Sequence, residues 1–217
     1  YDNLRKFILF MLPTNGGEAL VVIAAILFEL TLAMTPAQIL WINMVTSSTL
    51  GLALAFEPAE DGLMRRRPRP PGASLLSGFF VWRVILVSVL MMTGALGLFL
   101  WELSLGTGLE TARTMAVNAI VVAEMFYLLN SRHVLASVLN WKGLTGNRVA
   151  LWAIAACVPL QLAFTHLPLM QSIFGSTDLH AVEWLKVLAA GLLVFSVAEL
   201  EKLVIRRSPL AGRLTAV

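Results

Sequence analysis

Six long apolar runs constrain this chain more than any other feature of its sequence. They span residues 7–32, 37–56, 79–103, 114–129, 150–167 and 182–205. Each is close to or above the length of about 20 residues that lets a helix cross a hydrocarbon core roughly 30 Å thick. The chain is 58% hydrophobic and only 13% charged, against about 45–50% and about 25% in soluble domains. We therefore expect an all-α membrane protein, a bundle of six transmembrane helices in a lipid bilayer.

The basic residues predict how this bundle is oriented. An even number of spans places both termini on one side, and of the 16 Lys and Arg residues only Arg113 and Lys186 fall on the other side. Because cytoplasmic loops carry the excess of Lys and Arg, we expect both termini to be cytoplasmic, in a multi-pass protein of the plasma membrane. The net charge of +3 is too small to indicate a nucleic-acid-binding surface.

Two further features refine this organisation. Residues 57–78 form a basic, Pro-rich connector, which we expect on the cytoplasmic side, and the first run lacks the pattern of a cleaved signal peptide, so we expect a retained helix. The single cysteine, Cys157, lies in an apolar run and has no second cysteine to pair with. This excludes a disulfide framework and a thiolate metal site.

Polar residues at membrane depth are the candidates for function, because an ionisable group there is costly and usually faces the bundle interior. In the first span Asn15 and Glu18 are three residues apart, which places them on one helix face. In the second span Asn43, Thr46 and Ser47 share a face, and in the fourth span Glu124 lies in an apolar run. The alternative for each hydroxyl is a bond to its own helix backbone, and for each Glu a protonated, hydrogen-bonded packing role.

The first span also contains residues that predict a bent or loosened helix. Pro13 cannot donate a backbone hydrogen bond, and Gly16 and Gly17 permit close backbone approach, so we expect a loosened helix with carbonyls free to bind an ion. Amide, hydroxyl, carboxylate and carbonyl oxygens suit hard cations such as Ca²⁺, Mg²⁺, Na⁺ or K⁺. The sequence therefore predicts a cation site between the first, second and fourth spans.

A series of motifs resembles a known family. The motifs, in chain order, are Asn15-x-x-Glu18, Leu-Trp41-Ile-Asn43-Met-Val-Thr46, Phe56-Glu-Pro58, Glu124-Met125 and Leu129-Asn130-Ser131. This order is similar to the last six membrane helices of type II P-type cation-transporting ATPases, and above all to the calcium pumps of the sarcoplasmic-reticulum type. The resemblance covers essentially the whole chain and implies that the spans correspond to the fifth to tenth helices of a ten-helix transport domain.

The resemblance also implies roles for the polar residues. Cation-binding positions would be Asn15, Glu18, Asn43, Thr46, Ser47 and Glu124, of which Glu18, Asn43, Thr46 and Glu124 would be the metal ligands. Calcium pumps carry an aspartate where this chain has Ser47, so the site has one negative charge fewer. That change disfavours two divalent ions and leaves a single Ca²⁺ or Mn²⁺, a Na⁺ or K⁺ ion, or protons as candidates.

Motifs that the family uses for chemistry are missing from this sequence. It has no Asp-Lys-Thr-Gly-Thr phosphorylation motif and no Thr-Gly-Glu motif, so we expect no catalytic residue and no ATP hydrolysis by the chain alone. ATP and Mg²⁺ would act only through an amino-terminal remainder, with four more helices and the cytoplasmic domains, as the partner. The alternative is a stand-alone six-helix protein, either channel-like or an assembly subunit.

Overall fold

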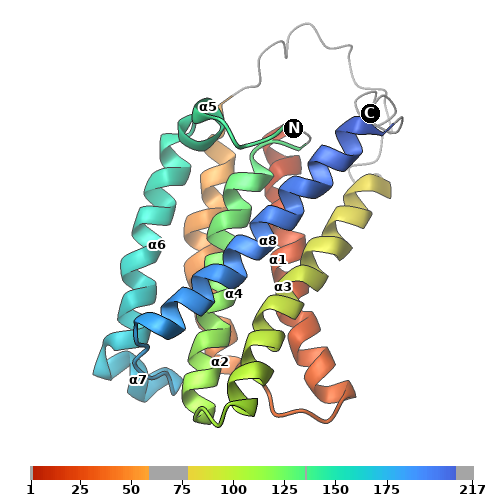
Figure 1. The fold of residues 1–217 in the computed structure, drawn as a ribbon. Coiled ribbons are helices and arrows are strands. Elements are labelled where there is room, and N and C mark those ends of the chain that lie inside the picture. Colours follow the sequence, from red (N-terminus) through yellow and green to blue (C-terminus); the bar gives the residue numbers. More distant parts are fainter. Residues whose placement is uncertain (1, 59–77, 135, 209–217) are drawn as a thin grey trace, which may run out of the picture.

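The computed structural model describes residues 2–58, 78–134 and 136–208, which form a bundle of helices (Figure 1). Six helices are long and apolar enough to cross a membrane. They are α1 (Asp2–Leu27), α2 (Pro36–Thr46) with its continuation to Phe56, α3 (Gly78–Ser104), α4 (Leu109–Ser131), α6 (Arg148–His166) and α8 (Ala181–Arg207). The described residues contain no strand, which confirms the predicted all-α membrane fold.

Shorter elements complete the chain. The second span continues beyond α2 as a π-helix, η1 (Ser47–Gly51), and a 3₁₀ turn, η2 (Leu54–Phe56). Two short helices, α5 (Trp141–Thr145) and α7 (Pro168–Phe174), lie at opposite ends of α6 (Figure 1). The first and last described helices begin and end at the same end of the bundle, as an even number of spans requires. Most of the connector 57–78 lies outside the described residues.

Local sequence signals explain where several helices begin and end. Thr35 caps α2 by accepting a hydrogen bond from the Gln38 backbone N–H, and Pro36 occupies the first turn, where its missing N–H costs nothing. Asn147 caps α6 in the same way. Helix α1 ends at Leu27, earlier than residue 32 where the apolar run ends, and Glu29 has a positive φ of 53° that a continuing helix does not allow.

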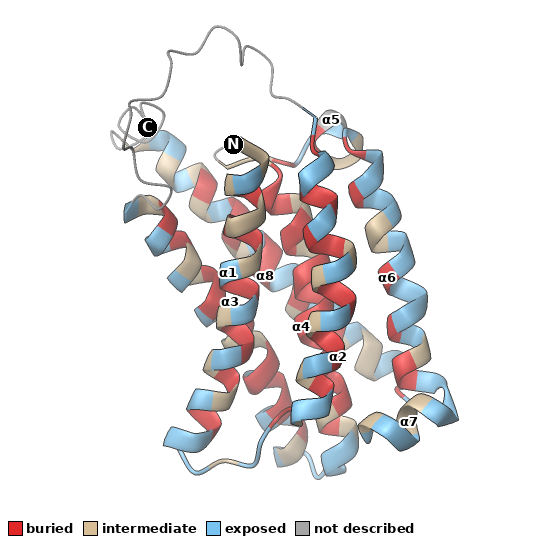
Figure 2. Ribbon diagram, turned by 180° about the vertical axis from the view of Figure 1, so that it is seen from behind, coloured by how far each residue is buried: buried red, intermediate tan, exposed pale blue. Residues whose placement is uncertain are grey.

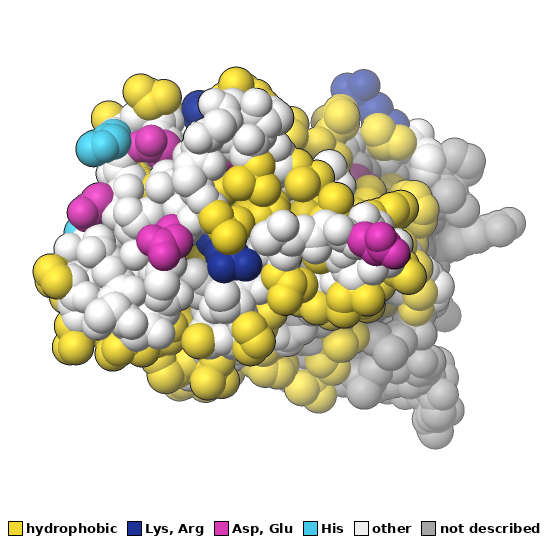
Figure 3. Space-filling view, turned by 90° about the horizontal axis from the view of Figure 1, so that it is seen from below, with side chains coloured by type: hydrophobic (Ala, Val, Ile, Leu, Met, Phe, Trp, Pro, Cys, Tyr) yellow, Lys and Arg dark blue, Asp and Glu magenta, His cyan; other side chains and the backbone are white. Residues whose placement is uncertain are grey.

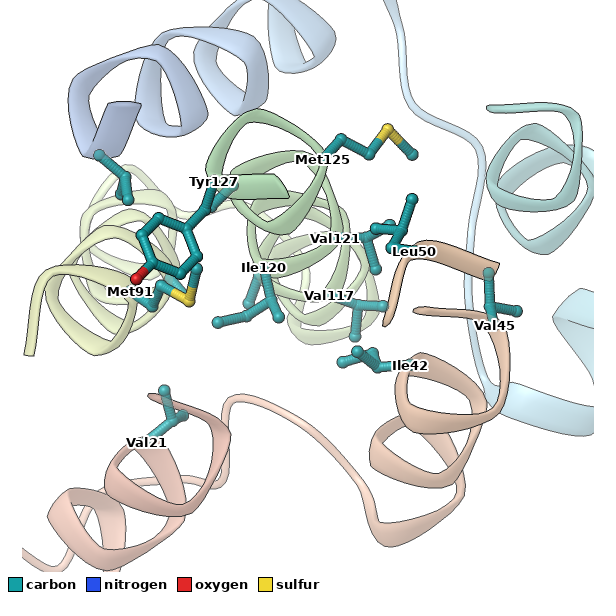
Figure 4. Close-up of a cluster of buried hydrophobic side chains, with 14 of the residues drawn as sticks. Val21, Ile42, Val45, Leu50, Met91, Val117, Ile120, Val121, Met125 and Tyr127 are labelled. Atoms are coloured by element: carbon teal, nitrogen blue, oxygen red, sulfur yellow. The ribbon is translucent and has the colours of Figure 1, made fainter. Parts of the chain in front are cut away.

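Helix α4 is the centre of the bundle. In the most apolar 18-residue stretch of α4, 83% is buried, against 28–44% in the corresponding stretches of the other five spans. Figure 2 shows buried residues concentrated on α4 and on the inward faces of its neighbours. Its Val117, Ile120 and Val121 pack against side chains of α1, η1 and the other elements around it (Figure 4). Helix α4 contacts each of the other five spans. Its side chains therefore supply both the core packing and any polar group that is buried at the centre of the bundle.

The outward faces are apolar as well. Trp152 on α6 is 75% exposed and Leu185 on α8 is 66% exposed, and many other large apolar side chains on the outer helix faces are similarly open. The end of the molecule opposite the termini carries scattered acidic, basic and His side chains among hydrophobic ones (Figure 3). An apolar belt of this extent matches a hydrocarbon environment, since soluble monomers rarely expose such continuous patches.

Candidate cation site

Helix α1 continues through Pro13, and neighbouring helices donate to the carbonyls around it. Pro13 has no N–H, so the carbonyl of Leu9, one turn earlier, has no donor in its own helix. The Tyr127 hydroxyl of α4 donates to that carbonyl at 2.9 Å, and the Ser88 hydroxyl of α3 donates to the Pro13 carbonyl at 3.0 Å. The expectation of a loosened helix with carbonyls free to bind an ion is therefore wrong: α1 continues through Pro13, and Tyr127 satisfies the Leu9 carbonyl.

The two glycines that follow Pro13 allow a close contact between α1 and α3. A Cβ on Gly16 would lie 2.3 Å from the Ser88 Oγ, and one on Gly17 would lie 2.8 Å from the Met91 Cβ. Helices α1 and α3 therefore approach too closely for any larger residue at these positions without a shift. This contact holds the second half of α1, with Glu18, against the bundle.

A carboxylate and an amide meet between α1 and α2. Glu18 is 4% exposed, and the Asn43 side-chain amide donates to Glu18 Oε2 at 2.6 Å and to the Ile39 carbonyl at 3.1 Å. Because the Asn43 amide nitrogen makes both of these bonds, its side-chain oxygen is left as an acceptor that could bind a cation. These two predicted ligands are thus brought together across two helices.

The polar end of α2 is built around the π-helix. The Thr46 hydroxyl donates to the Ile42 carbonyl at 3.0 Å, and the Thr49 hydroxyl donates to the Val45 carbonyl. Each hydroxyl oxygen keeps lone pairs for another partner after donating its proton. Immediately after Thr46, the α-helix widens into the π-helix that starts at Ser47, a distortion that is frequent at functional sites.

The second carboxylate comes from α4. Glu124 is 1% exposed, lies beside Thr46 and feels the charge of Glu18. Among the described residues, no group donates a hydrogen bond to either of its carboxylate oxygens. Because a buried ionised carboxylate without a partner is strongly destabilising, this position favours a bound cation or a proton.

Not every predicted ligand joins this group. Asn15 is exposed and its amide donates to the Met11 carbonyl of its own helix at 3.0 Å. Ser47 is half-buried at the start of the π-helix. The structure thus gathers Glu18, Asn43, Thr46 and Glu124, with Ser47 next to Thr46 in the chain, whereas Asn15 is exposed on α1.

Sequence reasoning missed one neighbour of this group, Cys157, and the donor to the carbonyl near Pro13, Tyr127. Cys157 of α6 is buried, and it interacts with Thr49 and with the charge of Glu124. Tyr127 lies three residues after Glu124 on α4. An apolar run gives no sign that Cys157 faces a carboxylate from another helix, whereas Pro13 could have indicated that a donor such as Tyr127 was needed.

The charge of the site comes from two carboxylates. In the described part of the chain, no three His, Cys, Asp or Glu side chains are close enough together to hold a metal ion. Three of the buried basic side chains, Arg83, Arg132 and Lys202, pair with Glu201, Glu57 and Glu199. A cation at Glu18 and Glu124 would therefore rely on neutral oxygens for its remaining ligands.

Comparison with known proteins adds an independent observation. A family described as "Cation transporting ATPase, C-terminus" matches residues 31–204. The chain is 46% identical over 190 residues to a probable cation-transporting ATPase F of Mycobacterium tuberculosis, covering 87% of this chain and 21% of that protein. It is 36% identical over 191 residues to the cation-transporting ATPase pma1 of Synechocystis, covering 85% and 21%.

A more distant relative extends the comparison to eukaryotes. The endoplasmic reticulum calcium ATPase srcA of Aspergillus fumigatus is 27% identical over 240 residues, covering 95% of this chain and 24% of that protein. The chain spans about a fifth of the length of the curated relatives it matches.

Proposed function

Because this chain belongs to the cation-transporting ATPases, of which it is the C-terminal membrane region, we propose that it supplies most of the intramembrane cation site of an ATP-driven pump. It is an integral, multi-pass membrane protein region with six apolar spans. The transported cation would bind between α1, α2 and α4. The remainder of the pump would provide the partner with which this region works.

The observation that carries the proposal is the pair of buried carboxylates. Glu18 is held by Asn43 at 2.6 Å, while Glu124 lies beside Thr46 with both oxygens unpartnered. Each carboxylate comes from a different helix, so a change in the relative position of α1, α2 and α4 would alter the ligand geometry. A site of this kind binds a cation in one arrangement and releases it in another.

The donor set favours a hard cation. Carboxylate, amide and hydroxyl oxygens from Glu18, Asn43, Thr46 and Glu124 would be the metal ligands, and Ser47 would add a neutral oxygen from the π-helix. With two carboxylates, one divalent ion such as Ca²⁺ or Mn²⁺ would be neutralised fully. A single Na⁺, K⁺ or proton could share the site with one protonated Glu.

The proposed chemistry of this chain is binding and release. It contributes no residue to phosphoryl transfer, so ATP and Mg²⁺ would act through the amino-terminal remainder of the pump. We propose that both termini, with the basic side chains of that end, face the cytoplasm of a cell whose plasma membrane holds the pump. The charge asymmetry in the sequence supports this orientation.

Cation-stimulated ATP hydrolysis by the complete pump tests the site. In Glu18→Gln and Glu124→Gln, we expect the cation concentration for half-maximal activity to rise at least tenfold, which corresponds to about 1.4 kcal/mol of binding free energy. The matched control is Glu110→Gln, because Glu110 is an exposed carboxylate in the first turn of the same helix as Glu124. Unchanged cation affinity in both site variants would refute the assignment.

A further inference from the structure

The three helices that carry the proposed site converge a second time, at Glu57. The side-chain amide of Asn3, in the first turn of α1, donates to the Glu57 carbonyl at 2.9 Å and to the Ala55 carbonyl at 3.0 Å. Arg132, directly after α4, donates through Nε to both Glu57 carboxylate oxygens, at 3.1 and 3.0 Å. Glu57 itself follows the last turn of the second span.

A fourth element joins at the same point. The Asn147 amide, which caps α6, donates to Glu57 Oε2 at 2.6 Å, while its oxygen accepts from the backbone N–H groups of Val149 and Ala150. Arg132 also donates to the Gly143 carbonyl. We call Glu57, Arg132 and Asn147 the inner clamp.

The inner clamp is buried and its donors and acceptors are used on several sides. The side chains of Arg132 and Glu57 are only 2% and 4% exposed. A guanidinium has five donors in a fixed plane, so bonds to the Glu57 carboxylate and to a loop carbonyl define one orientation. A lysine ammonium at this position could not reproduce that geometry, since it is a point charge on a flexible stem.

The clamp and the cation site lie on the same two helices. Arg132 follows Glu124 by eight residues, which is about 12 Å along α4 at 1.5 Å per residue. On the other helix, Glu57 follows Thr46 by eleven residues, and the intervening chain contains the π-helix Ser47–Gly51. The π-helix lacks regular α-helical hydrogen bonding. The position of Thr46 relative to Glu124 would therefore also depend on the contacts that hold Glu57, at the far end of the second span.

We propose that the inner clamp is a positioning device that holds the second span against α4 and thereby sets the distance between Thr46 and Glu124 across the cation site. This inference rests on the proposed function, because its readout is cation affinity. Arg132, Glu57 and Asn147 touch no cation and act only through the helices that they join. Loosening the clamp should therefore weaken cation binding even though every ligand is still present.

The test uses variants of the complete pump, with cation-stimulated ATPase activity and thermal unfolding measured on each. In Arg132→Met we expect at least a fivefold rise in the half-maximal cation concentration, a smaller change in kcat and a lower unfolding temperature, because Glu57 is left buried without its charge partner. Arg132→Lys should give an intermediate cation affinity. The double variant Glu57→Gln with Arg132→Met removes both charges.

This double variant separates positioning from stability. We expect it to recover most of the thermal stability, since no unpaired charge remains buried. The raised half-maximal cation concentration should persist, because the hydrogen bonds of the Arg132 guanidinium are still missing. Return of both quantities to wild-type values would overturn the positioning role. So would a clamp variant that folds stably and binds cation with unchanged affinity.

The matched control is the pair of Arg83 and Glu201 at the same end of the bundle, which joins α3 to α8 while Arg83 also donates to the Val134 carbonyl after α4. The double variant Arg83→Met with Glu201→Gln should keep cation affinity within twofold, and an equal shift there would contradict a specific clamp. Glu18→Gln and Glu124→Gln distinguish the two levels of inference. If these two leave affinity unchanged, the site is wrong; if they raise it and the clamp variants do not, only the clamp is wrong.

Discussion

Replacing Tyr127 by Phe tests how α1 is stabilised around Pro13. The change removes one hydroxyl and keeps the ring, which is fully buried and stacks with Phe10 at a centroid distance of 6.2 Å. What is lost is the hydrogen bond to the Leu9 carbonyl at 2.9 Å. That carbonyl has no donor in its own helix because residue 13 is proline.

The structure sets the expected magnitude. An unsatisfied buried acceptor costs about 1–3 kcal/mol, whereas side-chain hydrogen bonds between membrane helices average about 0.6 and reach about 1.7 kcal/mol. Here the acceptor has no alternative donor in its helix, so we expect the upper part of the membrane range, about 1–1.7 kcal/mol. The assay is equilibrium unfolding of the purified protein in mixed micelles.

A second background makes the reasoning refutable. In Pro13→Ala, the new backbone N–H can donate to Leu9, so Tyr127→Phe should then cost at most about 0.5 kcal/mol. The coupling between the two positions would be about 1 kcal/mol, above the roughly 0.3–0.5 kcal/mol by which independent sites deviate from additivity. An equal cost of Tyr127→Phe in both backgrounds would show that the hydroxyl does not replace the missing donor.

Three other perturbations probe packing, pH and a buried ion pair. Gly191→Ala should lower the unfolding free energy by about 1–3 kcal/mol, because its Cβ would lie 2.6 Å from a valine side chain of α4. In the control Gly97→Ala, the new Cβ meets nothing within 4 Å and should raise the unfolding free energy by about 0.5–1 kcal/mol. An unchanged unfolding free energy in Gly191→Ala would contradict the close contact between α4 and α8. Burial, followed by nearby basic side chains, lowers the pKa of His133 from its usual 6.5. The unfolded chain therefore binds the proton at a higher pH than the folded chain does, so stability falls as the pH drops through about 6.5. His133→Asn should flatten the dependence of the unfolding temperature on pH between about pH 7.5 and 5.5, and an unchanged slope would exclude His133 as its source. The Lys202 ammonium is 0% exposed and lies 2.9 Å from Glu199. Glu199→Gln leaves it without its charge partner, which should lower the unfolding free energy by about 3–5 kcal/mol in equilibrium unfolding. The double variant with Lys202→Met should recover most of that loss.

Some parts of the cation site follow from sequence alone and others do not. Glu18 and Glu124 can be selected because a carboxylate at membrane depth is costly wherever its helix packs. Asn15 was selected by its spacing from Glu18, yet it is exposed and bonds to its own helix. Helical spacing places two residues near one face, but only the neighbouring helices decide which edge of that face is buried.

The same distinction separates the fold from its internal contacts. Six apolar runs determine a six-helix membrane bundle by themselves, because a backbone in lipid must satisfy its own hydrogen bonds and each run is long enough to do so as a helix. Only the tertiary structure decided that α4 is central, that Tyr127 and Ser88 donate to the carbonyls of Leu9 and Pro13, and that Glu57 meets Arg132 and Asn147. Those pairings join residues tens of positions apart, and they depend on how helices cross and rotate against one another, which hydrophobic length and spacing leave undetermined.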